Sequence, residues 1–245
     1  MQYSQEENNQ KKDKNNSSTF YDLWENIKKE SSTSINQELL EEIPEEEFFE
    51  DGKSRDYNFK IILAGDGAVG KTSLRQRYLG KDFSGHYQQT IGADFAVYEE
   101  TVGSNKVKFI IWDLAGQPRF NEVRKMYYHG CHGALILFDI TNHSSFKNLQ
   151  HWINELWLNS TKGPLPFIIV ANKTDLQEPS IPSVSHKIIE DYVHKIGQET
   201  LKRYHFRVRS IFTSAKTGEN VEIAFKRLAI QIIAHMRYLE KIRAI

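Results

Sequence analysis

The sequence feature that most constrains this fold is a glycine-rich loop between an apolar run and a helical pattern. Residues 59–64 (FKIILA) form a short apolar run, which is typical of a buried strand. The next eight residues, GDGAVGKT, match the pattern G-x-x-x-x-G-K-[ST], and residues 71–79 continue with helical periodicity. The order strand, loop, helix predicts a phosphate-binding loop, because its glycines let successive backbone N–H groups point at a phosphate.

Two side chains of this loop carry predicted chemistry of their own. Lys71 is expected to place a positive charge on the outer phosphates of a nucleotide, and the Thr72 hydroxyl to ligate Mg²⁺. A chance match in a glycine-rich turn is the alternative, and the correctly placed strand and helix argue against it. The residues predicted to surround the phosphates are Gly65, Gly67, Ala68, Val69, Gly70, Lys71, Thr72 and Ser73.

Strand and helix patterns alternate along the rest of the chain. Further apolar runs lie at residues 109–112, 134–140, 167–171 and 208–213. Helical patterns lie at residues 71–79, 146–158, 186–204 and 221–243. Residues 94–102 and 106–112 flank a Gly-Ser-Asn turn and predict a hairpin. The sequence therefore predicts an α/β fold, with a six-stranded, mostly parallel sheet, one antiparallel pair and about five helices.

A second motif indicates which base the pocket accepts. Asn172, Lys173 and Asp175 directly follow the apolar run 167–171, where an open parallel sheet binds ligands. A carboxylate at Asp175 can accept hydrogen bonds from the ring N–H and the exocyclic amine of guanine, a pair that adenine does not offer. On its own this motif could be a turn at a strand end. After the last strand, however, Ser214, Ala215 and Lys216 can place a backbone N–H on guanine O6.

Two further segments are expected to respond to a third phosphate. Asp113 follows the run 109–112 and can hold Mg²⁺ through water, while the Gly116 N–H can bind a γ-phosphate. Gln117 can orient the attacking water, so Gln117, Lys71 and Gly116 are the predicted catalytic groups. Thr90 can close over Mg²⁺ when the γ-phosphate is present. Thr72, Thr90 and Asp113 are thus the predicted metal-binding residues.

These motifs, in this order and each at a strand end, resemble those of the Ras superfamily of small GTPases. Residues 90–95 (TIGADF), 112–117 (WDLAGQ) and 127–130 (YYHG) are most similar to the Rab branch. The resemblance covers about residues 57–240. It implies a P-loop domain that binds GTP and GDP with Mg²⁺, hydrolyses GTP slowly and signals through loops that change with the nucleotide. It also implies effectors, a nucleotide exchange factor and a GTPase-activating protein as partners.

The resemblance assigns roles to several aromatic residues. It implies that Phe83 packs edge-on against guanine and that Tyr87 closes over the γ-phosphate. It also implies that Phe95, Trp112 and Tyr127 form an aromatic cluster that effectors recognise, with simple core packing as the alternative for these three. The chain departs from the family pattern in Pro118 after the catalytic glutamine, in a longer span between Asp175 and Ser214, and in lacking a C-terminal cysteine for prenylation.

Composition limits where the protein acts and what it binds. A single cysteine excludes an internal disulfide and favours a reducing compartment. No run of 18 apolar residues exists, and no basic-aromatic pattern indicates nucleic-acid binding. We expect a cytoplasmic monomer with at most peripheral membrane contact, recruited by a partner.

The first 56 residues differ from the rest in composition. They carry 15 acidic and seven basic residues, against 17 and 25 in the remainder. The sequence thus predicts an acidic, mostly disordered extension at 1–56 and a small GTPase domain at 57–245. Phe20, Leu23, Trp24 and Ile27 recur at helical spacing and predict a short helix at 20–29. The extension is either a solvated linker or a docking segment that folds on binding.

Two other classes of function remain as alternatives. A nucleotide-locked scaffold that never turns over would explain the loop without catalysis, but intact Gln117, Thr90 and Lys71 argue against it. A P-loop ATPase or small-molecule kinase would share the loop, but the Asn172–Asp175 motif and the absence of a substrate lid insertion argue against that class.

Overall fold

The computed structural model describes residues 54–83 and 89–244, so residues 1–53 of the predicted extension, with the helix predicted at 20–29, lie outside the described residues. Within that part of the chain, six strands form one sheet in the order β2-β3-β1-β4-β5-β6. The strands are β1 (Asp56–Ala64), β2 (Ala93–Val102), β3 (Asn105–Leu114), β4 (Gly133–Asp139), β5 (Phe167–Asn172) and β6 (Arg209–Thr213). β2 pairs antiparallel with β3, and every other neighbouring pair is parallel. The predicted sheet with its single antiparallel pair is confirmed.

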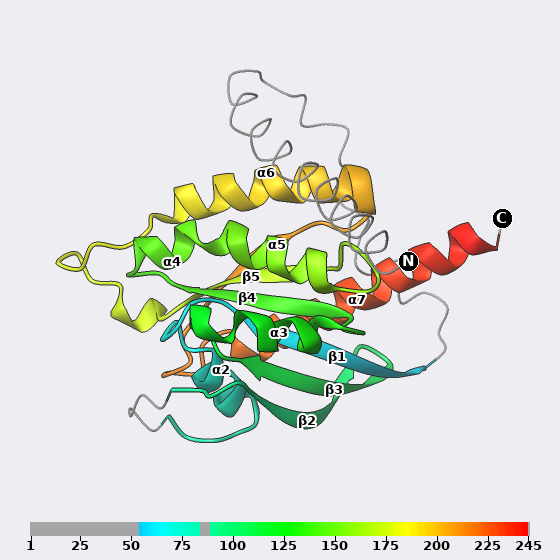
Figure 1. The fold of residues 1–245 in the computed structure, drawn as a ribbon, viewed down its shortest axis with the longest axis horizontal. Helices are drawn as coiled ribbons and strands as arrows, with labels where there is room; N and C mark the ends of the chain where they lie inside the picture. Colours follow the sequence, from blue (N-terminus) through cyan, green and yellow to red (C-terminus); the bar gives the residue numbers. More distant parts are fainter. Residues whose placement is uncertain (1–53, 84–88, 245) are drawn as a thin grey trace, which may run out of the picture. The chain divides into compact units, whose positions relative to one another are not determined.

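Helices cover both faces of this sheet. They are α2 (Lys71–Tyr78), α3 (Asn121–Tyr128), α4 (His143–Lys147), α5 (Leu149–Asn159), α6 (His186–Tyr204) and α7 (Val221–Arg243), with the 3₁₀ turns η3 (Pro118–Phe120) and η4 (Thr174–Leu176). Figure 1 shows α5 and α6 side by side along one face, where α5 contacts β4 and α6 contacts β6. α2 and α7 contact each other, and α7 also packs on β4 and β5.

The helices differ from the predicted ranges in two places. The pattern at 146–158 covers parts of two helices, which are divided at Asn148. The first starts earlier than predicted because the Asn142 side chain caps it, accepting hydrogen bonds from the N–H groups of Ser144 and Ser145. Helix α3 has no counterpart among the predicted ranges. Its sequence NEVRKMYY mixes charged and apolar residues over only eight positions, too short a window for a clear helical period.

The core lies on both faces of the central strands. Ile61 and Leu63 of β1 are fully buried in the cluster that Phe225 and Leu228 of α7 complete. The intervening Ile62 is equally buried, although it points to the other face. Burial on both faces explains why the strands appear in the sequence as continuous apolar runs instead of an alternating pattern.

The parallel arrangement gathers the predicted motifs at one edge. The chain leaves β1 at Ala64, β3 at Leu114 and β5 at Asn172, all toward the carboxyl edge of the sheet. Loops that follow parallel strands meet there, and such an edge is where open α/β sheets bind ligands. No helix in the described part of the chain is both long and apolar enough to span a bilayer.

The packing of α7 yields a stability prediction. Phe225 is fully buried and stacks on Tyr78 of α2 with ring centroids 3.7 Å apart. Phe225→Ala removes this contact and leaves a cavity, so we expect the free energy of unfolding to fall by about 3–5 kcal/mol. Denaturant titration with saturating GDP measures it, with Ile223→Ala, which truncates an exposed side chain of the same helix, as the control. Equal unfolding midpoints for the two variants would contradict the packing described here.

Candidate nucleotide-binding site

A pocket of about 390 Å³ lies where the strand-end loops meet. Its walls are Gly67, Ala68, Gly70, Lys71, Thr72, Ser73, Gln76, Phe83, Thr90, Gly116, Gln117, Asn172, Lys173, Asp175, Leu176, Ala215 and Lys216. All but Gln76 and Leu176 were predicted from the sequence. Of the other predicted site residues, Gly65, Val69, Asp113 and Ser214 are not part of the pocket wall, and Tyr87 falls outside the described residues.

Two glycines allow the phosphate loop to lie against its neighbours. Gly65 has a φ of +136°, and a Cβ atom there would lie 2.2 Å from the carbonyl oxygen of Leu137 in β4. Gly70 has a φ of +99°, and a Cβ atom there would lie 2.3 Å from the Asn172 amide nitrogen. Any side chain at either position would push the loop away from β4 or β5. The loop can therefore present its backbone to the pocket only with glycine at both positions.

Lys71 crosses beneath the loop it follows. Its ammonium group donates hydrogen bonds of 2.6 Å to the carbonyl oxygens of Gly65 and Asp66, and only 6% of the residue is exposed. Burial lowers the pKa of Lys71 to about 8, although the nearby carboxylates of Asp113 and Asp66 partly oppose this. A buried cation with so depressed a pKa is stabilised by any anion that enters the pocket.

The three predicted metal-binding residues come together from three elements. The Thr72 hydroxyl of α2 donates a 2.5 Å hydrogen bond to Asp113 Oδ2 at the end of β3. The same hydroxyl lies 3.0 Å from that of Thr90. Asp113 is fully buried, and burial raises its pKa despite the hydrogen bond from Thr72 and the charge of Lys71.

The second carboxylate oxygen of Asp113 supports a cation at this position. Asp113 Oδ1 is buried and has no hydrogen-bond partner. Hydroxyl and carboxylate oxygens are the ligands that Mg²⁺ prefers, and Mg²⁺ usually keeps several waters. The cluster of Thr72, Thr90 and Asp113 therefore fits a hydrated Mg²⁺ ion.

At the other end of the pocket, Asn172 connects three segments. Its amide nitrogen donates to the Val69 carbonyl at 2.9 Å, while its Oδ1 accepts from the Thr213 hydroxyl at 3.0 Å and the Ala215 N–H at 3.2 Å. The side chain thus joins the phosphate loop to the loop after β6. Its neighbour Lys173 adopts a left-handed conformation and pairs with Asp139 at 2.6 Å.

Asp175 is held in place by the loop after β6. Ser214 donates a 2.6 Å hydrogen bond to Asp175 Oδ1, and Lys216 lies 3.8 Å from Oδ2. Arg77 of α2 in turn donates to the carbonyl oxygens of Ala215 and Lys216, at 3.1 Å and 2.5 Å. Helix α2 therefore contributes to both ends of the pocket. Nothing in the sequence indicated that Arg77 would bind the loop after β6.

Gly116 and Gln117 approach the phosphate loop from the opposite side. A Cβ atom at Gly116 would lie 2.4 Å from the carbonyl carbon of Asp66 and 2.5 Å from the amide nitrogen of Gly67. The Gln117 side chain extends over Gly67, with its Nε2 3.7 Å from where a Cβ atom would lie. Its Oε1 is buried without a hydrogen-bond partner. This arrangement places Gly116 against the phosphate loop and an unpaired amide oxygen of Gln117 beside it.

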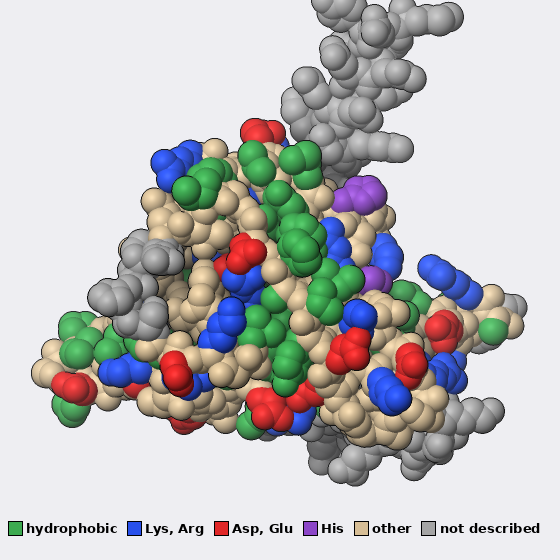
Figure 2. All heavy atoms as spheres, turned by 90° about the horizontal axis from the view of Figure 1, so that it is seen from below, with side chains coloured by type: hydrophobic (Ala, Val, Ile, Leu, Met, Phe, Trp, Pro, Cys, Tyr) green, Lys and Arg blue, Asp and Glu red, His purple; other side chains and the backbone are tan. Residues whose placement is uncertain are grey.

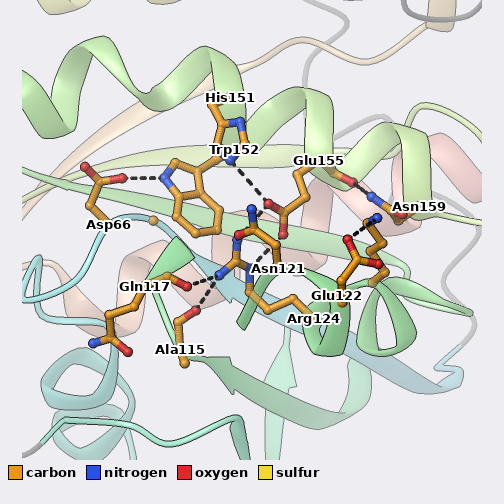
Figure 3. A network of polar contacts seen from close by, with 12 residues as sticks. Asp66, Ala115, Gln117, Asn121, Glu122, Arg124, His151, Trp152, Glu155 and Asn159 are labelled. Carbon is orange, nitrogen blue, oxygen red and sulfur yellow. Dashed lines mark hydrogen bonds and ion pairs between the residues drawn. The ribbon is translucent and has the colours of Figure 1, made fainter. Parts of the chain in front are cut away.

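Behind these two residues lies a polar network that the sequence did not reveal. Figure 3 shows Arg124 of α3 between the segment 115–117 and helix α5, with Glu155 and Trp152 beside it. Arg124 is 1% exposed and forms an ion pair with Glu155 at 2.7 Å. An arginine in a short amphipathic segment is normally assigned to the solvent, so no signal in the sequence marks this pair.

The three aromatic residues implied as an effector surface do lie together. The ring centroids of Phe95 and Trp112 are 5.2 Å apart, and those of Trp112 and Tyr127 are 4.9 Å apart. Phe95 of the edge strand β2 is 57% exposed, and Val97 two residues later is 48% exposed. From the side of β2, hydrophobic side chains form a band between charged ones (Figure 2). An exposed cluster of this kind is typical of a protein-binding surface.

Comparisons with known proteins agree with this geometry. The sequence model of the Ras family matches residues 60–234. The chain is 33% identical to the Ras-related protein Rab-13 of Mesocricetus auratus, over 74% of this chain and 83% of the relative. It is 36% identical to the Ras-related protein Rab-19 of Mus musculus, over 73% and 77%. It is 37% identical to the Ypt/Rab-type GTPase YPT7 of Saccharomyces cerevisiae, over 69% and 79%.

The depressed pKa of Lys71 predicts proton uptake on nucleotide binding. At pH 8 about half of the Lys71 side chains in nucleotide-free protein are neutral, and phosphate oxygens favour the charged form. GDP binding should therefore take up roughly half a proton at pH 8 and about a tenth at pH 7. Calorimetry in two buffers of different ionisation enthalpy measures the uptake. Binding enthalpies at pH 8 that do not depend on the buffer would contradict the prediction.

Proposed function

Because the chain belongs to the Ras family of small GTPases and to its Rab branch, we propose that the pocket between β1, β3, β5 and β6 is its GTP site and that residues 90 and 116–117 sense the third phosphate. The protein is a GTP-binding switch and a GTPase, as its relatives show. The observation that carries the site assignment is the pocket itself. It brings the phosphate loop, Gln117, Asp175 and Ala215 together from four separate loops.

The base is proposed to lie between Phe83 and the Asp175 carboxylate. Ser214 and Lys216 hold Asp175 without using both of its oxygens fully, so the carboxylate can accept from guanine. Phe83 is 43% exposed and lines the same pocket. The Asn172 amide already forms hydrogen bonds with the Val69 carbonyl and the Thr213 hydroxyl. It would therefore position the loops around the base and not bind the base itself.

The phosphates are proposed to lie over the turn from Gly65 to Ser73. The loop N–H groups and Lys71 would bind the β- and γ-phosphates, and Thr72, Thr90 and Asp113 would hold Mg²⁺, Asp113 through water. The ion supplies positive charge between the two outer phosphates. Thr90 and Gly116 would keep their loops in this position only while a γ-phosphate is there to bind, so their loops change with the nucleotide.

Hydrolysis is proposed to depend on Gln117, which would orient the attacking water, with Lys71 and the Gly116 N–H stabilising charge on the phosphate. The segment 82–90 contains no arginine. The two arginines of α2 are engaged elsewhere, Arg75 with Asp94 and Arg77 with the loop after β6. A partner would have to supply a catalytic arginine, so slow turnover and a GTPase-activating protein are part of the proposal.

The exposed aromatic cluster is proposed as the effector surface. Phe95 on β2 and Tyr127 on α3 flank Trp112 on β3, so the cluster spans three elements next to residues 90 and 116–117. Similarity to Rab proteins supports a role in membrane trafficking, with effectors and an exchange factor as partners. We propose a monomer as the working form. The intact Gln117 and Thr90 disfavour a scaffold that never hydrolyses GTP.

Base recognition predicts a specificity change at Asp175. Asp175→Asn keeps an oxygen to accept from Ser214 but puts an amide where the carboxylate faced the base. GTP affinity should fall by at least about tenfold per hydrogen bond lost, and xanthosine triphosphate should become the preferred ligand. Competition binding measures this, with Glu178→Gln, which neutralises an exposed carboxylate outside the pocket, as the control. An unchanged preference for guanine would refute the assignment of the base site.

The absence of an arginine in the segment 82–90 predicts slow intrinsic turnover. Without an arginine in cis, the transition state lacks stabilisation worth on the order of 10³–10⁵ in rate, so intrinsic turnover should lie far below about 1 s⁻¹. An activating protein that supplies an arginine should restore it, and Gln117→Leu should abolish that response. Single-turnover hydrolysis measures both, with Gln198→Leu on α6 as the control. A Gln117→Leu variant that still responds to its activator would show that Gln117 does not orient the water.

A further inference from the structure

Arg124 is the most completely bound charged side chain beside the pocket. Its Nε and Nη2 donate to the two carboxylate oxygens of Glu155, at 2.7 Å and 2.9 Å, and Nη2 also donates to Asn121 Oδ1. Its Nη1 donates to the carbonyl oxygens of Ala115 and Gln117, at 3.0 Å and 2.9 Å. A guanidinium has five N–H groups in a fixed plane, and these five bonds use all of them. The orientation of the group is therefore fully determined.

The anchor of this group is a helix that belongs to the rigid part of the fold. Glu155 lies on α5, which packs against β4, and is 8% exposed. Burial alone would raise the pKa of Glu155, but hydrogen bonds from Arg124 and His151 outweigh it and lower the pKa to about 2. The carboxylate is thus charged at any physiological pH. Trp152, one turn earlier on α5, lies under the guanidinium with its ring centre 4.6 Å away.

The two carbonyl oxygens that Arg124 holds lie on either side of Gly116. The Ala115 carbonyl belongs to the same peptide plane as the Gly116 N–H, and in a trans peptide the two groups point in opposite directions. No cis peptide occurs among the described residues. A hydrogen bond that pulls the Ala115 carbonyl toward α5 therefore turns the Gly116 N–H away from α5. Gly116 lies against the phosphate loop, where a Cβ atom built on it would lie 2.4 Å from the Asp66 carbonyl carbon and 2.5 Å from the Gly67 amide nitrogen, and both residues line or adjoin the pocket.

The same helix also holds the phosphate loop. Trp152 Nε1 donates to Asp66 Oδ1 at 2.7 Å, and the Asn148 amide donates to Asp66 Oδ2 at 2.8 Å. Figure 3 shows Asp66, Trp152, Glu155 and Arg124 in one continuous row between the phosphate loop and the segment 115–117. The phosphate loop and the segment 115–117, which form the two walls of the phosphate end, are thus both held by α5 and the residue before it. Their separation depends on α5 as well as on the sheet.

We propose that Arg124, anchored by Glu155, is a positioning residue that orients the Gly116 N–H and the Gln117 backbone toward the γ-phosphate. The proposal rests on the assignment of Gly116 and Gln117 made above and adds the residue that holds them. Its consequence is specific to the third phosphate. GDP reaches the phosphate loop but has no group for the Gly116 N–H, so the clamp by Arg124 contributes to the affinity for GTP and not for GDP.

Two variants test this without leaving an unpaired buried charge. Arg124→Lys keeps the charge beside Glu155, but a single ammonium cannot reach the carboxylate and both carbonyls at once. The double variant Arg124→Met with Glu155→Leu removes the whole ion pair and replaces it by apolar groups of similar volume, which buried pairs often tolerate. Lys125→Gln breaks only the exposed pair with Glu122 on the same helix and is the matched control.

The measurement is the affinity of the full-length protein for GDP and for a non-hydrolysable GTP analogue, with Mg²⁺. Loss of one well-oriented hydrogen bond to a phosphate should weaken binding of the analogue about tenfold or more in both Arg124 variants. GDP affinity should stay within about twofold of the parent, and Lys125→Gln should change neither. Analogue and GDP affinities that fall together would show a purely structural role, and unchanged values for both would show no role; either result overturns the proposal.

Gly116→Ala separates failure of this inference from failure of the site assignment. A methyl group at Gly116 cannot fit against Asp66, so the N–H must move. Loss of GTP preference in Gly116→Ala but not in the Arg124 variants would support the site assignment and show that Arg124 does not orient the Gly116 N–H. Full GTP preference in Gly116→Ala would mean that Gly116 does not contact the γ-phosphate, and the proposal on Arg124 would fall with it.

Discussion

The amide of Asn172 is the contact on which the geometry of the pocket depends. Asn172 is 1% exposed, and its side chain joins the Val69 carbonyl of the phosphate loop to the Ala215 N–H of the loop after β6 (the base loop). No residue with a side chain fits at position 70, because the Asn172 amide occupies the space where its Cβ atom would lie. The two ends of the pocket are therefore kept at a constant separation by one side chain at the end of a central strand. A nucleotide that spans both ends finds the distance already set, which lowers the conformational cost of binding.

Buried charge is concentrated around the phosphate end. Lys71 and Asp113 lie there with their pKa values shifted by burial toward the neutral form, and Asp113 keeps one oxygen without a partner. Desolvated groups of this kind are unfavourable until counter-charges arrive. Phosphates and Mg²⁺ would supply them, so the pocket is built for a ligand that brings both signs of charge. Arg124 and Glu155 differ, because each already satisfies the other and their charge is structural.

The sequence identified most of the residues that line the pocket because the motifs that contain them are local. The phosphate loop, Asn172–Asp175 and Asp113–Gln117 are short segments in which the backbone and a few side chains work together, and each follows an apolar run that marks a strand. Helix α3 was not anticipated, since its eight amphipathic residues are fewer than the window over which a helical period is judged, and it packs against α5. Domain limits, the extension and the roles of the site residues remain predictions.

Hydrophobic periodicity and turn chemistry in the sequence thus determined the order of the strands and of most helices, the single antiparallel pair and the edge at which the motifs meet. Only the tertiary structure decided that Arg124 points inward to Glu155 and that Arg77 holds the base loop. It also decided that α5 holds both the phosphate loop and the segment that faces it. The physical reason is that the burial of a charged side chain depends on what packs against its helix. Arg124 and Glu155 are 31 positions apart, and nothing local to either one records the other.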